Sequence, residues 1–324
     1  MRAAVCSRYG PPDVVQVEEI PPPVLTSGSV RVAVHAASVN YPDVLIVANE
    51  YQVSAPLPFV PGSEFAGVVT ETGEGVTGFA VGDRVFGTLF VGAFAEEVVA
   101  GTTALTLTPD GVDHRAASAF GVAHRTAYHS LRTTAAVQPG EQVVVLGAGG
   151  GVGLAAVALG VALGATVTAV ASTPEKLAAA TAAGATHLVN HRDGDLRGAL
   201  RAVLPDGADV VIDPVGGALA EPALRTLRYG GRFVTIGYAA GEIPRIPLNL
   251  VLLKGIRIVG FEFMSFMTHE TEAMVRNERE LLTLLAEGRA TPHLGATFPL
   301  AEAAAALTYV ADGHAIGKVV LDVR

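Results

Sequence analysis

The chain has 324 residues, more than one ordinary domain, so two domains are the natural expectation. Half of the residues are hydrophobic and 16% are charged, which fits a soluble α/β enzyme and argues against disorder. The net charge of −9 disfavours nucleic acid and anionic membranes as main partners, because both require a basic face.

The first ~115 residues predict a mostly β domain. Apolar and polar residues alternate there, glycines are frequent, and prolines stand at positions 21–23 and at Pro56, Pro58 and Pro61. Prolines and glycines at this density break helices and end strands, so we expect short strands joined by turns.

A buried strand, a tight turn and a helix are predicted between residues 142 and 164. Residues 143–146 are β-branched or apolar, segment 147–153 reads Gly-Ala-Gly-Gly-Gly-Val-Gly, and apolar residues at helical spacing then lead to Gly164 as a cap. A helix that begins at glycines presents free N–H groups to a diphosphate, so we expect a dinucleotide. Alanine replaces the first glycine of the usual fingerprint, and a packing turn without a ligand is the alternative. The residues expected to contact the dinucleotide are Ala148, Gly149, Gly150, Gly151 and Val152.

This uncharged region does not predict a membrane span, because its helical part is only about twelve residues long. Cys6 is the only cysteine, which excludes an intrachain disulfide and any Cys₄ or Cys₂His₂ zinc site. We expect a cytoplasmic protein.

Strands and helices continue to alternate after residue 164. Strands are expected at 165–171, 187–190, 209–213, 231–236 and 256–260, with helices from Pro174 and Asp193 and near 219–227. Ser172 or Thr173 can cap the first of these helices, and Asp193 can cap the second. The pattern predicts a doubly wound Rossmann sheet of six parallel strands.

The tail is expected to hold a helix near 300–310 and a strand at 318–323, and to return to the first domain. The expected domains are therefore 1–118 with 288–324, and 119–287. We expect a ligand cleft between them, where the parallel strands end.

The order of these parts resembles the medium-chain dehydrogenase/reductase superfamily, and within it the zinc-free quinone oxidoreductase (zeta-crystallin-like) branch. The supporting segments, besides the glycine turn, are 37–43 (Ala-Ser-Val-Asn-Tyr-Pro-Asp), 61–67 (Pro-Gly-Ser-Glu-Phe-Ala-Gly), 82–85 (Gly-Asp-Arg-Val), 213–216 (Asp-Pro-Val-Gly) and 317–321 (Gly-Lys-Val-Val-Leu). The likeness covers nearly the whole chain and implies a GroES-like, mostly β catalytic domain beside the Rossmann domain.

The resemblance also implies that no catalytic zinc is bound. Zinc-dependent members carry cysteine where Asn40 stands, histidine where Ser63 stands, and a second cysteine near Val122, whereas Glu64 is kept. None of these three residues replaces the lost ligands. His124 and His129 are five residues apart and do not share a helix face well, so we interpret them as polar or packing residues.

NADPH is favoured over NADH as the cofactor. No acidic residue stands at Ser172, where NAD-specific folds place one against the ribose 2′-hydroxyl. By resemblance, Lys176 and His191 are expected near the 2′-phosphate, with hydroxyl groups of Ser172 and Thr173. A solvated surface lysine is the alternative for Lys176.

Tyr51 is the first candidate for the catalytic hydrogen-bond donor, and Asn40 is the second. By resemblance, Tyr51 matches a tyrosine that points at the substrate carbonyl. A phenol or amide N–H can stabilise an enolate oxygen, and Tyr51 or water would then supply the proton. Tyr41 is a rival donor, a loop-packing role is the alternative for Tyr51, and a turn cap is the alternative for Asn40.

The resemblance places further residues near the nicotinamide: Ile236, Gly237, Phe261, Phe263 and Lys318. Segment 262–267 holds two phenylalanines and two methionines, which suits an apolar substrate pocket, a lid or dimer packing. The strand at 256–260 would be the edge of the sheet, where relatives pair across a homodimer.

The predicted function is a zinc-independent, NADPH-dependent reductase that transfers a hydride to a small-molecule quinone or α,β-unsaturated carbonyl. One alternative is an enoyl-thioester reductase of the same superfamily, acting on an enoyl-CoA or a carrier-bound acyl chain. The other is a cofactor-binding protein without catalytic activity, which would not need Asn40 and Tyr51 together.

Overall fold

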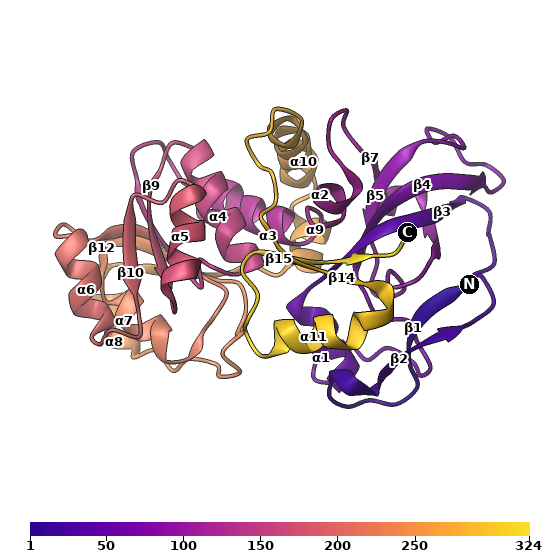
Figure 1. Cartoon of the computed structure of the whole chain (residues 1–324). Helices are drawn as coiled ribbons and strands as arrows, with labels where there is room; N and C mark the ends of the chain where they lie inside the picture. Colours follow the sequence, from indigo (N-terminus) through magenta and orange to yellow (C-terminus); the bar gives the residue numbers. More distant parts are fainter. The chain divides into compact units, whose positions relative to one another are not determined.

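The computed structural model describes residues 1–324, which form two compact units (Figure 1). The first unit contains residues 1–122 and 291–324, and the second contains residues 123–290. The domain boundaries expected from the sequence lie a few residues before these. No helix is long and apolar enough to cross a bilayer.

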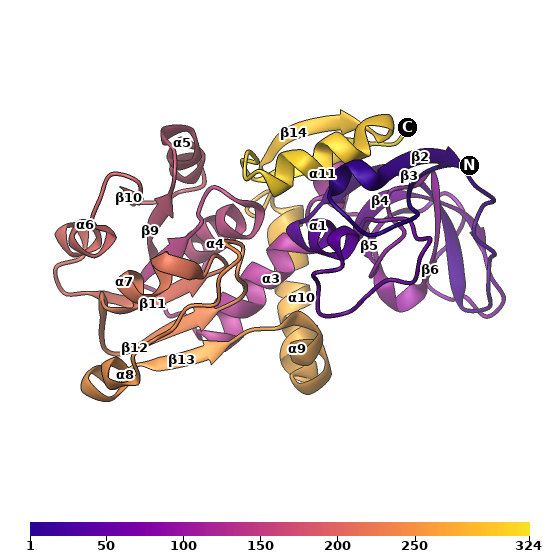
Figure 2. The same cartoon turned by 90° about the horizontal axis from the view of Figure 1, so that it is seen from below.

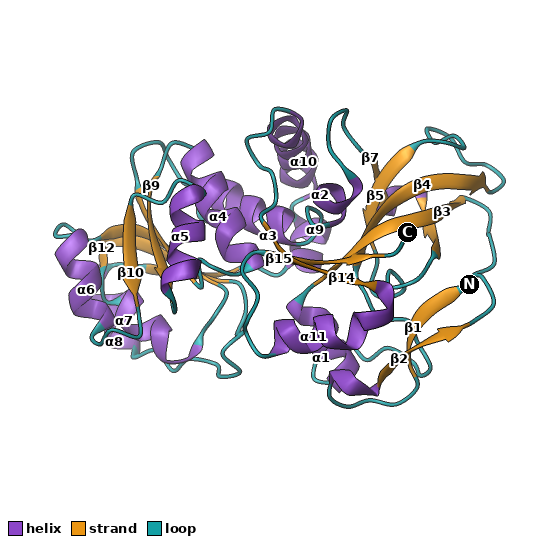
Figure 3. Ribbon diagram, viewed as in Figure 1, coloured by secondary structure: helices purple, strands orange, loops and turns teal.

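The first unit is built on a seven-stranded sheet, with a separate antiparallel pair formed by β1 and β2. Its elements are β1 (Arg2–Cys6), β2 (Val15–Glu19), β3 (Ser29–Val39), α1 (Tyr41–Ala48), β4 (Glu64–Thr72), β5 (Arg84–Thr88), β6 (Glu97–Gly101), β7 (Leu105–Leu107), α2 (His114–Ser118), β14 (Leu294–Pro299), α11 (Ala303–Ala311) and β15 (Lys318–Asp322). The strand order is β14-β15-β3-β4-β5-β7 (Figure 3), and β6 also pairs with β3.

The tail of the chain completes this sheet. β15 pairs antiparallel with β3, placing Val319 opposite Val39 and Leu321 opposite Ala37. Apolar side chains of β3, β4 and β15 share one core with α1 and α11. Residues at the start of β15 are therefore held beside the end of β3, although almost the whole sequence separates them.

The second unit is a doubly wound parallel sheet of six strands, which confirms the predicted fold class. Its elements are α3 (Ala123–His129), a π-helix (Ser130–Thr134), β8 (Gln142–Leu146), α4 (Gly151–Ala162), β9 (Thr166–Ala171), α5 (Pro174–Ala182), β10 (His187–Asn190), α6 (Leu196–Val203), β11 (Ala208–Asp213), α7 (Ala220–Leu224), β12 (Leu227–Thr235), α8 (Leu248–Lys254), β13 (Arg257–Gly260), α9 (Phe263–His269) and α10 (Thr271–Ala286).

Helices cover both faces of this sheet. α6, α7 and α8 share an apolar core with Val144, Leu146 and Val211 of the sheet. α4 packs against α3 and against β8 and β9, and α5 packs against β9 and β10 (Figure 2). Burial on both faces explains why β8 and β9 carry no charged residue.

The boundaries of α6, α7 and β12 differ from the prediction. α6 begins at Leu196 with Asp195 as its cap, not at Asp193, because Gly194 adopts φ +129 and cannot join a helix. β12 begins at Leu227, and the helix predicted near 219–227 ends at Leu224. A register shift between β11 and β12 accompanies Gly230, whose φ is +74.

The strand order β10-β9-β8-β11-β12-β13 reverses its direction of growth between β8 and β11. Ligands of open α/β sheets bind at such a switch point, beyond the carboxyl ends of the strands. Gly147 follows β8 and Pro214 follows β11 there. A methyl group on Gly147 would lie 2.6 Å from a Val215 methyl carbon, so the two loops are in contact.

Candidate functional site

The turn between β8 and α4 is closed tightly by glycines. Gly147 adopts φ +61, and its carbonyl oxygen accepts the N–H of Gly150 at 2.9 Å. A Cβ atom on Gly153 would lie 2.1 Å from that same carbonyl oxygen. Glycine is therefore required at both positions by the fold itself, whatever binds there.

Gly150 has no such intramolecular reason to be glycine. Its φ of −85 suits any residue, and the only protein atom near an added Cβ would be the Gly147 oxygen at 3.5 Å, an ordinary contact. Gly150 is also the N-cap residue of α4, and no side-chain hydrogen bond caps the helix there. The missing Cβ leaves a cradle at a positive helix end, which fits a phosphate group.

Lys176 lies directly beside this turn. An added Cβ on Gly149 would be 2.5 Å from the Cβ and Cγ atoms of Lys176, so glycine at 149 makes room for the stem of the lysine. Thr173 caps α5 by accepting the Lys176 N–H, at 3.3 Å. The structure thus brings Lys176, the turn and the end of β9 together.

His191 and Arg192 extend this basic group after β10. Burial, and then the charge of Arg192, lower the pKa of Lys176. Burial, then Arg192 and more weakly Lys176, also lower the pKa of His191. Because like charges lie close together, an anion bound among them would relieve their repulsion.

Asp213 secures the loop on the other side of the switch point. One carboxylate oxygen accepts the N–H groups of Val215 and Gly216, both at 2.8 Å. The other is buried and has no hydrogen-bond partner within the protein. Burial raises the pKa of this carboxyl. Asp213 was expected only as part of the segment 213–216, and no local sequence pattern predicts this role.

The residues expected near the nicotinamide follow β12 and β13. The N–H of Ile236 donates to the Asp213 carbonyl at 2.8 Å, and the only neighbour of an added Gly237 Cβ would be the Pro214 oxygen at 3.6 Å. Phe261 is buried, whereas Phe263 is half-buried at the start of α9.

His129 packs against these phenylalanines as a buried core residue. Its ring centroid lies 6.4 Å from that of Phe261, 5.8 Å from that of Phe263 and 4.7 Å from that of Phe266. Its ring nitrogens contact Asn277 and Glu278. His124 is also buried, so the packing interpretation suits both histidines.

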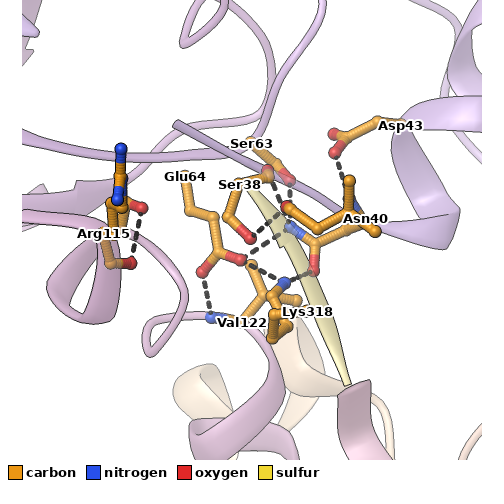
Figure 4. A network of polar contacts seen from close by, with 10 residues as sticks. Ser38, Asn40, Asp43, Ser63, Glu64, Arg115, Val122 and Lys318 are labelled. Carbon is orange, nitrogen blue, oxygen red and sulfur yellow. Dashed lines mark hydrogen bonds and ion pairs between the residues drawn. The ribbon is translucent and has the colours of Figure 1, made fainter. Parts of the chain in front are cut away.

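In the first unit, three residues distant in sequence form a buried polar network (Figure 4). The Lys318 ammonium donates to Asn40 Oδ1 and to Glu64 Oε1, both at 2.5 Å. The Asn40 amide donates to Glu64 Oε1 at 2.9 Å, and the Val122 N–H donates to Glu64 Oε2 at 2.8 Å. Hydrogen bonds thus join the three side chains to one another and to the backbone N–H of Val122.

The network differs from two sequence expectations. Lys318 was expected to reach the cofactor, but it is 3% exposed and its ammonium is directed to Asn40 and Glu64. Asn40 was expected to donate to a substrate, but its side-chain N–H groups face Glu64 and, at 3.3 Å, Ser63. Both differences arise because Glu64, a buried carboxylate, attracts every nearby donor.

Asp43 lies at the edge of this network. Its carboxylate accepts the Asn40 N–H at 2.7 Å, in a capping box at the start of α1, and also bonds the Ser63 hydroxyl. Its other oxygen is buried and has no partner. Burial raises the pKa of Asp43 to about 7, although its hydrogen bonds and the charge of Lys318 act in the opposite direction.

Tyr51 lies in the loop after α1, half-buried against the apolar core of the first unit. The helix ends at Asn49, which adopts φ +59 and turns the chain toward Tyr51. The rival, Tyr41, is the first residue of α1 and is also half-buried.

Comparisons with known proteins agree with this architecture. Residues 26–144 match the family described as alcohol dehydrogenase GroES-like domain, and residues 151–279 match the family described as zinc-binding dehydrogenase. Quinone oxidoreductase-like protein 2 of Bos taurus is 38% identical over 325 aligned residues, which cover 100% of this chain and 93% of that protein. The chain belongs to the quinone oxidoreductase branch of the medium-chain dehydrogenase/reductase superfamily. The predicted family is thereby confirmed, and the protein is an oxidoreductase of this superfamily.

Two solved structures illustrate the likeness in three dimensions. Escherichia coli quinone oxidoreductase complexed with NADPH is 27% identical, with a TM-score of 0.91 and full coverage of both chains. A structure described as an NAD-dependent alcohol dehydrogenase is 30% identical, with a TM-score of 0.92 and full coverage of both chains. The two names differ in cofactor, so the choice of cofactor depends on this chain's own residues.

The residues of the first unit do not fit the zinc that one family description names. Asn40 and Val122 contact Glu64, and Ser63 contacts Asn40, but they offer an amide, a backbone N–H and a hydroxyl in place of thiolate and imidazole ligands. No group of three or more His, Cys, Asp or Glu side chains could hold a metal ion.

Asp43 predicts a pH dependence of folding stability. Its pKa is raised from 3.8 to about 7, so between these values the folded state holds a proton that the unfolded state has released. Stability should therefore fall as pH rises from 4 to 7, by on the order of 3 kcal/mol from this group, and level off above. Asp43→Asn should flatten that slope in urea unfolding series. Asp83→Asn, at an exposed turn where Asp83 accepts the Ala80 N–H, is the control and should leave the slope unchanged. Equal slopes in wild type and Asp43→Asn would contradict the assignment.

Gly150→Ala and Gly153→Ala should affect different properties, the first ligand affinity and the second stability. Gly153→Ala should lower stability by about 2 kcal/mol or more, because its Cβ would collide with the Gly147 oxygen. Gly150→Ala should change stability by less than about 1 kcal/mol but weaken nicotinamide dinucleotide binding at least roughly tenfold. Thermal unfolding and fluorescence titration measure the two effects. A Gly150→Ala protein that binds as wild type does would exclude this turn as the phosphate cradle.

Proposed function

We propose that the protein is an NADPH-dependent reductase that transfers a hydride to a quinone or to an α,β-unsaturated carbonyl. The observation that carries this proposal is the position of Lys176 against Gly149, beside an uncapped helix start at the switch point of a Rossmann sheet. NADPH supplies the hydride when it is bound. The protein's own residues hold the diphosphate, recognise the 2′-phosphate and bind the acceptor carbonyl.

The basic group formed by Lys176, His191 and Arg192 supports NADPH over NADH. A 2′-phosphate carries almost two negative charges, which would offset the burial and the Arg192 charge that lower the pKa of Lys176 and of His191. Ser172 lies half-buried at the end of β9 and adds a hydroxyl in place of the acid that NAD-specific folds carry. Glu175 is solvent-exposed at the first turn of α5, where the helix dipole stabilises its charge.

The first unit offers hydrogen-bond donors and no metal ligands, which supports a substrate that can accept a hydride without a metal ion. Interconversion of alcohols and aldehydes relies on a Lewis acid, whereas a quinone or enone carbonyl is activated sufficiently by a hydrogen bond. In the proposed reaction Tyr51 donates this bond to the carbonyl oxygen, on which charge develops during hydride transfer. Tyr51 or water then supplies the proton. Tyr51 stays the first candidate, and Asn40, whose side-chain N–H groups face Glu64 and Ser63, stays the second.

Reduction of an enoyl thioester is the alternative reaction, and cofactor binding without catalysis is the alternative function.

We propose a homodimer through β13, the strand at the edge of the sheet, because Ile258 on β13 and Leu252 and Leu253 on α8 are exposed. A light-scattering mass of one chain would contradict the dimer. A cytoplasmic location stays a prediction.

Lys176→Ala should weaken NADPH binding roughly tenfold or more and leave NADH binding almost unchanged. The reason is that only NADPH carries the phosphate that the ammonium would pair with. Fluorescence titration of wild type and variant with both coenzymes measures the effect. Similar affinities of the wild-type protein for NADPH and NADH would end the argument from Lys176.

Tyr51→Phe should lower kcat/KM for enones about 100-fold, because one aimed donor contributes ~3 kcal/mol to the transition state. The affinity for NADPH should not change. NADPH oxidation is followed with panels of quinones, enones and enoyl thioesters, and Tyr41→Phe serves as the matched control. If Tyr41→Phe loses activity and Tyr51→Phe does not, the rival tyrosine is the donor. If NADPH binds but no panel is reduced, the non-catalytic alternative replaces the reductase.

A further inference from the structure

The Lys318 ammonium is an unusual feature of the first unit. Lys318 and Glu64 are 3% and 1% exposed, and Asn40 is 7% exposed. A lysine is seldom buried this completely, because removing its charge from water costs several kcal/mol unless partners replace the water. Here two oxygens, Asn40 Oδ1 and Glu64 Oε1, replace it at 2.5 Å.

The backbone holds the lysine in this position. Lys318 opens β15, and its N–H donates to the His293 carbonyl at 2.8 Å. Gly317 before it adopts φ +68, and a Cβ there would lie 2.3 Å from that same carbonyl oxygen. Only glycine permits this approach, so the segment Gly317-Lys318 delivers an ammonium to a fixed point beside Glu64.

The atoms around the ammonium have the chemistry of a site for a hard cation. A carboxylate oxygen and an amide oxygen, both hydrogen-bonded to Nζ, are ligands that hard divalent ions prefer. The Ser63 hydroxyl lies 3.3 Å from the Asn40 amide nitrogen, next to this point. A second cation cannot enter while the ammonium is there, because like charges would meet in a buried space.

We propose that Lys318 is a built-in cation that takes the place of a metal ion in the GroES-like unit and keeps divalent metal ions out. The unit matches the family described as alcohol dehydrogenase GroES-like domain, and its buried Glu64 carboxylate is neutralised by the chain itself. Removal of the ammonium should therefore leave an unoccupied cation site formed by Glu64 and Asn40. This inference is independent of the proposed reductase activity.

The test compares Mn²⁺ binding by wild type and Lys318→Ala, using isothermal titration and the loss of the free Mn²⁺ electron-spin signal. Wild type should bind no Mn²⁺ tightly, and Lys318→Ala should bind about one ion per chain. Saturating Mn²⁺ should raise the melting temperature of Lys318→Ala by on the order of 3 °C and leave wild type unchanged. Lys318→Ala with Glu64→Gln should lose this binding.

Lys254→Ala is the matched control. Lys254 is a partly buried lysine of the second unit whose ammonium donates to the Arg225 and Leu227 carbonyls, with no carboxylate among these acceptors. Its removal should create no Mn²⁺ site. A folded Lys318→Ala that binds no Mn²⁺, or binding that survives Glu64→Gln, would overturn the proposal. If Lys318→Ala unfolds without metal, Mn²⁺ must restore its near-ultraviolet circular dichroism, and failure to do so would also overturn it.

Discussion

The Gly147 carbonyl oxygen lies so close to Gly153 that not even a methyl group fits between them. This contact brings the start of α4 directly onto the end of β8, at the point where the sheet order reverses. The free N–H groups of the helix therefore lie beside the loops that follow β9 and β11. The positions of Lys176 against Gly149 and of Val215 against Gly147 both depend on this close approach.

The two units differ in how their charged side chains are arranged. In the second unit, burial and then the charge of Arg192 lower the pKa of Lys176 and of His191. In the first unit, the Lys318 ammonium and the Glu64 carboxylate neutralise each other without a ligand. A cluster of basic side chains favours the binding of an anionic ligand, whereas the charges of a buried structural network must be paired within the protein.

Sequence reasoning succeeded where local patterns carry the information. The apolar run at 143–146, the glycine cluster and the alternation after it are sufficient to predict the Rossmann unit, because each pattern is read within a few residues. The predictions were less accurate where local geometry mattered: Gly194 moved the cap of α6 from Asp193 to Asp195, and Gly230 accompanies a longer β12. Gly164 was correctly expected at the end of α4, where its φ is +84.

The sequence by itself determined the fold class, the glycine turn after β8 and the absence of the usual zinc ligands, since these depend on residue type and short spacing. Tertiary structure alone decided the partners of Lys318, which is 278 positions from Asn40 and 254 from Glu64. Such a contact leaves no local pattern, because it exists only after β15 has paired with β3. A lysine expected at a cofactor became a buried counter-ion for this reason: a carboxylate enclosed in a core must be neutralised by whichever cation the fold brings to it.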